Sequence, residues 1–133
     1  MRKSDVKEDS MITQFRHPIA LVQDIEISKA FYRDVIGINI VQDSGSFVLF
    51  EGNFSIHDAA IFYGYIEKRY EGDKMGRDNL DLYLTTDDLT AMQEKLELAG
   101  VKFIHRIKKC EWGESVLRIY DPDGHIIEIG DAV

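Results

Sequence analysis

A glutamate stands inside an apolar run near the C-terminal end of the sequence. Glu128 lies in the segment HIIEI, residues 125–129, which directly follows the turn sequence DPDG. An unpaired carboxylate is rarely buried, because removing its charge from water costs free energy. Two partners would explain it. A metal cation could bind Glu128, which could then also act as a base, or the guanidinium of Arg118 on the preceding strand could pair with it.

The elements that would position Glu128 occur twice along the chain. A short apolar run, HPIALVQD, leads into a helical pattern, and three strand candidates follow. The same order begins again at LDLYLTTDD. His17 stands seven residues before Asp24, and Asp81 stands seven residues before Asp88, so the two copies are offset by 64 residues. Both aspartates are placed to cap the helix that follows them.

Each copy therefore predicts a strand, a helix and three further strands. The helices are expected over DIEISKAFYRDVIG and DLTAMQEKLELAG, and the later strands over INIVQ, SFVLF and FSIHDAAIFY in the first copy and VKFIH, SVLRIY and HIIEI in the second. One such sheet leaves an apolar face uncovered, so the two copies are expected to pair around a common core. The predicted fold class is α+β, with two tandem βαβββ modules pairing into a curved mixed sheet around a cleft. We expect a flexible N-terminal arm over residues 1–13 and a single domain over 14–133, with module one at about 15–64 and module two at about 79–131.

The composition limits the classes of partner. The chain has 133 residues and a formal net charge of -8, and it therefore lacks the basic face that binds nucleic acid or an anionic membrane. No apolar stretch approaches the roughly 20 residues of a membrane-spanning helix. The single cysteine, Cys110, cannot form an internal disulfide. The first residues lack the apolar centre of a signal peptide, and the expected location is the cytoplasm.

The two modules resemble the vicinal oxygen chelate superfamily. The resemblance rests on H-x-x-A-L-V-x-D-x-x-x-S-x-x-F-Y-R-D-V-I-G near the start and D-P-D-G-H-I-I-E-I near the end, and it covers roughly residues 15–131. This superfamily includes glyoxalase I, bleomycin-resistance proteins, fosfomycin-resistance enzymes and extradiol dioxygenases. The resemblance implies the glyoxalase/bleomycin-resistance fold, but one fold serves several reactions.

The resemblance also implies a set of metal ligands. In this superfamily the first and the last strand of each module supply one ligand each, which here gives His17 and His57 from module one and Asp81 and Glu128 from module two. Asp81 stands where the enzymes of the family usually have a histidine. His57 lies five residues after the hairpin glycine Gly52, whereas Glu128 lies four residues after Gly124. The two positions therefore differ by one residue, and a shift of one residue turns a side chain to the other face of a strand.

Two imidazoles and two carboxylates suit a divalent Zn, Ni, Fe, Co or Mn ion. The resemblance then implies a metal-dependent lyase or isomerase of the glyoxalase type, with Glu128 as the catalytic base and a hemithioacetal or hydroxy-carbonyl substrate. Trp112, Tyr83 and Arg118 are the expected substrate-binding residues. The alternatives are a metal-free protein that binds a drug or another small molecule, and an extradiol-type dioxygenase. Members of the superfamily commonly form homodimers, so a homodimer is expected.

Overall fold

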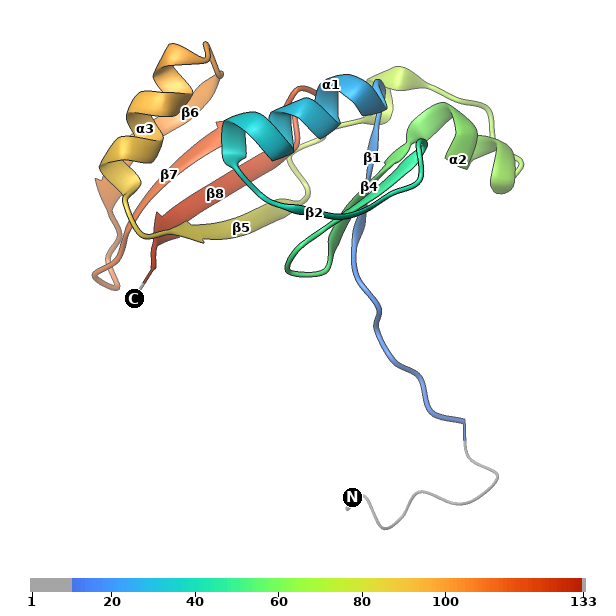
Figure 1. The fold of residues 1–133 in the computed structure, drawn as a ribbon, viewed down its shortest axis with the longest axis horizontal. Coiled ribbons are helices and arrows are strands. Elements are labelled where there is room, and N and C mark those ends of the chain that lie inside the picture. Colours follow the sequence, from blue (N-terminus) through green and yellow to red (C-terminus); the bar gives the residue numbers. More distant parts are fainter. Residues whose placement is uncertain (1–10, 133) are drawn as a thin grey trace.

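The structure is a computed structural model that describes residues 11–132, apart from the side chain of Asp73. The predicted flexible arm, residues 1–13, lies largely outside the described residues. Module one contains β1 (Ile19–Val22), α1 (Ile25–Ala30), η2 (Phe31–Ile36), β2 (Ile40–Asp43), β3 (Phe47–Phe50) and β4 (Phe54–Asp58) (Figure 1). Module two contains β5 (Asp81–Thr86), α3 (Leu89–Leu98), β6 (Phe103–Lys109), β7 (Ser115–Tyr120) and β8 (Ile126–Asp131). Between the modules lie α2 (Ala59–Tyr65) and the short η3 (Gly72–Lys74).

Each module forms its own four-stranded mixed sheet. Sheet A of module one has the order β1-β4-β3-β2, and sheet B of module two has the order β5-β8-β7-β6. In both sheets the first strand is parallel to the last strand of its module, and the other pairs are antiparallel. The predicted fold, two tandem βαβββ modules of the α+β class, is confirmed. The two ladders are not joined into one closed sheet, and β1 and β5 are edge strands.

The helices begin and end where the sequence predicts. The side chain of Asp24 accepts hydrogen bonds from the backbone N–H groups of Glu26 and Ile27, and that of Asp88 caps α3 by accepting one from the N–H of Ala91. The helix of module one changes from α1 to the wider π-helix η2 and ends at Gly37, whose φ of 90° requires a residue without a Cβ. None of the helices in residues 11–132 has the length and apolar content needed to cross a bilayer.

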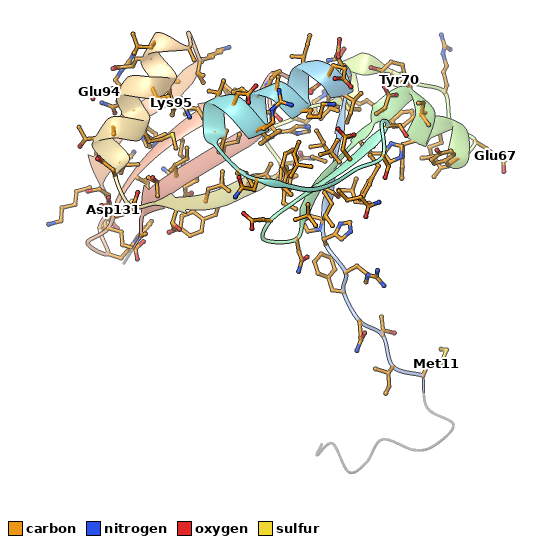
Figure 2. All side chains as sticks on the ribbon, viewed as in Figure 1. Met11, Glu67, Tyr70, Glu94, Lys95 and Asp131 are labelled. Carbon is orange, nitrogen blue, oxygen red and sulfur yellow. The ribbon has the colours of Figure 1, made fainter. Side chains whose placement is uncertain are left out.

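One apolar core lies between the helices and one face of each sheet. Figure 1 shows α3 and α1 on the same side of the strands, and Figure 2 shows Glu94 and Lys95 on α3. The core takes residues from both modules: Ala20, Val22, Phe31, Tyr32, Ile36, Val48, Phe50, Ile56, Leu89, Leu96, Leu117, Ile119, Ile127 and Ile129. The prediction that the two modules bury a shared core is therefore confirmed.

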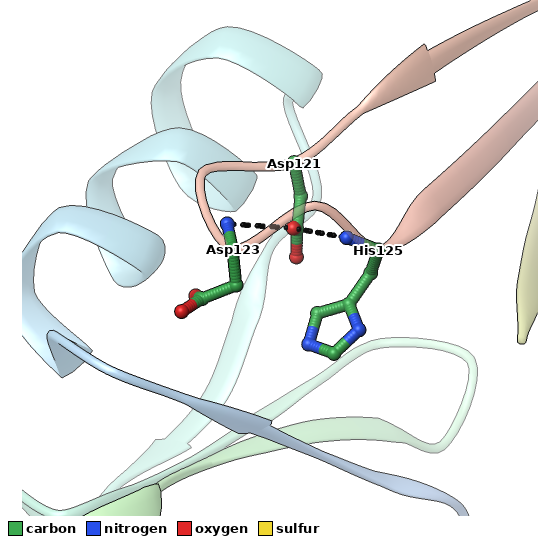
Figure 3. Close-up of side chains that lie close together, drawn as sticks. All are labelled: Asp121, Asp123 and His125. Atoms are coloured by element: carbon green, nitrogen blue, oxygen red, sulfur yellow. Dashed lines mark hydrogen bonds between the residues drawn. The ribbon is translucent and has the colours of Figure 1, made fainter. Parts of the chain in front are cut away.

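Polar contacts around Asp121 join the two modules. The Asp121 carboxylate accepts hydrogen bonds from the backbone N–H groups of Asp123 and His125, both at 2.8 Å (Figure 3). Its other oxygen accepts the hydroxyl of Tyr32 at 2.6 Å, from the helix of module one. Burial raises the pKa of Tyr32, and the charge of Asp121 raises it further, so the phenol stays protonated and remains a donor.

Two local expectations from the sequence are wrong. The segment FSIHDAAIFY is not one strand, because Asp58 caps a new helix, α2, by accepting a hydrogen bond from the N–H of Ile61. In the predicted helix DIEISKAFYRDVIG, the apolar residues Ile27 and Phe31 recur at a spacing of four, which predicts that both face the core, but Ile27 is 57% exposed and Ser28 is buried instead. A serine is tolerated there because its hydroxyl donates to Asp123 of module two.

The contact between Tyr32 and Asp121 predicts a stability effect. Tyr32→Phe keeps the ring but removes the donor to a buried charge, and we expect the free energy of unfolding to fall by about 1.5–3 kcal/mol. Urea unfolding measures this change. The matched control is Tyr65→Phe, at a tyrosine that is 65% exposed, where the change is expected to stay below about 0.5 kcal/mol. Equal effects of the two substitutions would contradict this account.

Candidate functional site

Sheet B carries a polar face on the side opposite its buried isoleucines. The strand register places Asp81 opposite Ile126, and Tyr83 and Arg118 opposite Glu128 from either side. Residues that face each other across paired strands lie on the same side of a sheet. We call this side, with Asp81, Tyr83, Arg118 and Glu128, the polar face of sheet B. It is accessible, since Tyr83 is 52% exposed.

The carboxyl groups of Asp81 and Glu128 are in contact on this face. Partial burial, a hydrogen bond from its carboxyl to Glu128 and the negative charge of Glu128 together raise the pKa of Asp81 to about 6. The positive charge of Arg118 acts in the opposite direction. Although the residue as a whole is exposed, its carboxyl group therefore holds a proton well above the ordinary pKa of 3.8. The pair therefore shares a proton at pH values below about 6.

Arg118 is the cation of the polar face. Its Nε donates to Glu128 Oε1 at 3.0 Å, and the side chains of this ion pair are only 25% and 14% exposed. Its Nη1 donates to Nε2 of His105 at 2.9 Å. Among residues 11–132, Nη2 has no hydrogen-bonding partner, which leaves its N–H groups for a ligand.

His17 lies two residues before β1, beside sheet A. Its Nδ1 is 3.1 Å from the hydroxyl of Ser55, and its ring centroid is 6.0 Å from that of Phe47. Ser55 is fully buried and also donates to the carbonyl of Pro18. The contact with Ser55 holds the imidazole against β4 and leaves Nε2 available as a ligand atom.

His57 lies on the same side of sheet A as His17, and aromatic side chains surround its ring. It is opposite Leu21 on β1 and Phe47 on β3, and its ring contacts Phe62 and Tyr65 of α2, each with centroids 5.6 Å apart. The side chain is 8% exposed, and Nδ1 lies 2.9 Å from the carbonyl oxygen of Asp58. That carbonyl can only accept, so Nδ1 carries the hydrogen and Nε2 is unprotonated in the neutral ring.

The register shows which position of module one corresponds to Glu128. Tyr83 is opposite Glu128, and the residue 64 positions before Tyr83 is Ile19, which is opposite Ser55. The structural counterpart of Glu128 is therefore Ser55, while His57 lies two residues farther along the same face. The counterpart of His57 is Gly130. A Cβ on Gly130 would lie 3.1 Å from Oη of Tyr83, so the glycine allows the tyrosine ring to lie over the strand.

The four expected metal ligands form two pairs on two sheets. Asp81 and Glu128 meet on sheet B, whereas His17 and His57 lie on sheet A, both beside Phe47. In the described part of the chain, no three of these four have ligand atoms within 4.8 Å of one another. In a single chain, therefore, Asp81 and Glu128 are in contact on one sheet, and the two histidines lie apart from them on the other.

The group of three that does meet this distance is Asp121, Asp123 and His125 (Figure 3). Its atoms already have partners within the protein. Besides the contacts of Asp121, the Asp123 carboxylate accepts from the N–H of Gln23 and the hydroxyl of Ser28, and Nε2 of His125 donates to the carbonyl of Leu21. The group is a structural connection between the modules, and we assign it no ion.

The other expected substrate-binding residues differ in their surroundings. Tyr83 lies on the polar face beside Glu128, as described above, while Trp112 stands 67% exposed in the loop between β6 and β7. A hollow of about 640 Å³ lies elsewhere, between the end of α3 and the turn from β7 to β8, and none of the expected site residues lines it. The candidate site of one chain is therefore an accessible sheet face and not a closed pocket.

The chain is similar to known proteins along almost all of its length. Residues 15–133 match the glyoxalase-like domain family. A crystal structure of a protein of unknown function from Agrobacterium tumefaciens str. C58 is 38% identical, with a TM-score of 0.84, and the match covers 96% of this chain and 100% of that one. No curated protein matches the chain significantly.

Two more distant structures have the same fold. A glyoxalase-related enzyme from Fulvimarina pelagi is 19% identical, with a TM-score of 0.74 over 91% of this chain and 89% of that one. A lactoylglutathione lyase from Agrobacterium tumefaciens is 20% identical, with a TM-score of 0.65 over 92% and 96%. The chain belongs to the glyoxalase-like domain family, as the two sequence motifs indicate, and these distant likenesses define its fold but not its reaction.

The raised pKa of Asp81 predicts a pH-dependent stability. Between the ordinary pKa of 3.8 and the raised value of about 6, the folded chain holds a proton that the unfolded chain has released. The contribution of Asp81 to the free energy of unfolding is therefore fully present below pH 3.8 and is lost as the pH rises through about 6. Asp81→Asn keeps a neutral donor beside Glu128 at every pH.

We expect Asp81→Asn to gain stability over the wild type between about pH 4.5 and pH 8, by on the order of 1 kcal/mol after allowance for solvent screening. Urea unfolding at both pH values measures it. Asp87→Asn, at an exposed aspartate beyond β5, is the control and should show no such pH-dependent difference. A constant difference between wild type and Asp81→Asn at both pH values would exclude the shared proton.

Proposed function

We propose that the protein is a metal-dependent lyase or isomerase of the glyoxalase type that acts on a small oxygenated substrate, a hemithioacetal or a hydroxy-carbonyl compound. The observation that carries the proposal is the contact between the Asp81 and Glu128 carboxyl groups on an accessible face. Two carboxylates this close repel each other unless a proton or a cation lies between them. A carboxylate that exchanges a proton can act as a base beside a carbonyl group, and a cation can polarise the carbonyl oxygen.

The donor types fit a divalent transition metal. Asp81 and Glu128 would hold the ion from sheet B, and His17 and His57, whose Nε2 atoms are available, would hold it from sheet A. Two imidazoles and two carboxylates suit Zn, Ni, Fe, Co or Mn. When bound, such an ion polarises a carbonyl oxygen and stabilises an enolate.

The protein's own residues supply the remaining functions. Glu128 moves a proton to or from the carbon next to the carbonyl. Arg118 holds Glu128 through Nε and offers Nη2 to a substrate oxygen. Tyr83 forms an aromatic wall beside them, and Trp112 extends from the adjacent loop.

We infer that a second copy of the chain completes the site. In one chain the two pairs of ligands lie on separate sheets, and the polar face of sheet B is accessible. Residues 11–16 extend away from the body, as Figures 1 and 2 show, with Met11, Ile12 and Phe15 exposed by 94%, 67% and 82%. Exposed apolar residues on an extended segment favour packing against another molecule, and a homodimer is the simplest such assembly.

A second candidate function is supported by the ion pair of Arg118 and Glu128. This pair neutralises the glutamate without a metal, as a small-molecule binding protein without an ion would require. The same face would then bind a ligand through Arg118 and Tyr83 and perform no chemistry. Metal content separates the two functions.

Metal binding is tested on protein purified without chelator and without added metal. We expect about one transition-metal ion per chain and a higher melting temperature on addition of Ni, Zn or Mn, since an ion at 100 times its Kd adds about 2.7 kcal/mol. Asp81→Asn should abolish the shift, and the exposed Glu111→Gln should retain it. Absence of bound metal together with an unchanged melting temperature would favour the binding protein.

Catalysis is tested with Glu128→Gln, which keeps the size of the side chain but removes the base. We expect turnover of a hemithioacetal or hydroxy-carbonyl substrate to fall by about 100-fold or more, the usual contribution of a general base. Glu111→Gln is again the control. Full activity of Glu128→Gln would exclude Glu128 as the base.

A further inference from the structure

His105 lies on β6, at the edge of sheet B, between two interruptions of the strand pairing. Phe103 is opposite Ile119 and His105 is opposite Arg118, so β6 advances two residues where β7 advances one. A second irregularity lies between His105 and Lys108. Such bulges turn the side chains that follow to the other face of the sheet. His105 therefore shares the polar face with Arg118, although Phe103 packs against the core.

The contacts of His105 define the state of its ring. Nδ1 lies 2.8 Å from the carbonyl oxygen of Arg106, and Nε2 lies 2.9 Å from Nη1 of Arg118. A carbonyl only accepts hydrogen bonds and a guanidinium only donates them. One form of the ring satisfies both contacts, the neutral imidazole with its hydrogen on Nδ1.

His105 is one of two protein groups that hold the guanidinium of Arg118. Within residues 11–132 the other is Glu128, which accepts from Nε at 3.0 Å. An arginine anchored at two of its nitrogens keeps one orientation, whereas a single contact would leave its long side chain free to change rotamer. The contacts therefore run from His105 through Arg118 to Glu128 and on to Asp81.

We propose that His105 is a positioning residue of the site, whose neutral ring holds Arg118 in the orientation that binds Glu128. A neutral acceptor suits this role, because a carboxylate in its place would compete with Glu128 for the positive charge. His105 itself contacts neither Asp81 nor Glu128 among its hydrogen bonds. The effect on catalysis rests on the proposed function, but the contact with Arg118 can be measured without any activity.

The first test uses the wild-type protein. Long-range nitrogen–proton NMR spectra of the histidine rings at neutral pH distinguish the two neutral forms. We expect His105 to have a protonated Nδ1 and an unprotonated Nε2. A hydrogen on Nε2 would overturn the proposal, because that nitrogen could not accept from Arg118.

The second test follows the Nε–H signal of Arg118 in variants of His105. His105→Phe keeps a ring but has no acceptor, and we expect exchange of the Arg118 Nε–H with water to accelerate about 10-fold or more. His105→Gln keeps an acceptor and should restore slow exchange, and Ile104→Val, at an exposed neighbour on the same strand, should leave it unchanged. Urea unfolding establishes that each variant is folded. Unchanged exchange in folded His105→Phe would overturn the proposal.

The third measurement connects the contact to catalysis. We expect kcat to fall about 10-fold in His105→Phe and to recover in His105→Gln, because His105 would act by orienting Arg118, a residue that contacts Glu128 directly. If kcat stayed unchanged while Arg118 lost its order, the catalytic role of His105 would be excluded. If Arg118 responded as expected but the wild type had no lyase or isomerase activity, the proposed function would fail and the positioning of Arg118 would stand.

Discussion

The buried carboxylate of Asp121 determines how the rest of the molecule is arranged. Two of its hydrogen bonds come from the turn that precedes β8, and they determine the residue at which that strand begins. The third comes from Tyr32 and attaches the helix of module one to module two. Because side chains alternate along a strand, a shift of one residue at the start of β8 would turn Glu128 into the apolar core. The polar face of sheet B and the union of the modules thus depend on the same carboxylate.

The two modules share a fold but have acquired different donors. Module two has Glu128 where module one has Ser55, and module one has His57 where module two has Gly130. One sheet consequently offers imidazoles in aromatic surroundings, and the other offers carboxylates beside an arginine. Duplication supplied the frame, and substitution within each copy gave the two faces different kinds of donor atom.

The sequence predicts the fold well because local signals and the repeat agree. Asp24 and Asp88 are helix caps, and the spacing of 64 residues places β1 and β5 in equivalent positions. The contact of Glu128 with Arg118 was one of the two explanations that its apolar surroundings allow. What the sequence does not predict depends on competing local signals and on the register of the strands. The helix α2 begins at Ala59, after its cap Asp58, in a segment whose aromatic and β-branched residues also favour a strand.

The role of His105 could not be read from the sequence for a related reason. An alternation of two places His105 with Phe103 and Ile107 on the core side, and only the bulges turn it to the other side. No residue type in this segment identifies a bulge. The correspondence of Ser55 with Glu128 is similarly a matter of register, which the pairing of β1 with β4 decides.

The irregular course of β6 has an additional consequence for solubility. As the outermost strand of sheet B, β6 has one side without a neighbouring strand in the described chain, and a straight strand of this kind can recruit another chain into a growing ladder. Two bulges bend it, and Lys108 and Lys109 put positive charge at its end, which makes a flat continuation of the sheet unfavourable. The bulges that place His105 on the polar face of sheet B thereby also protect the edge strand β6 from aggregation.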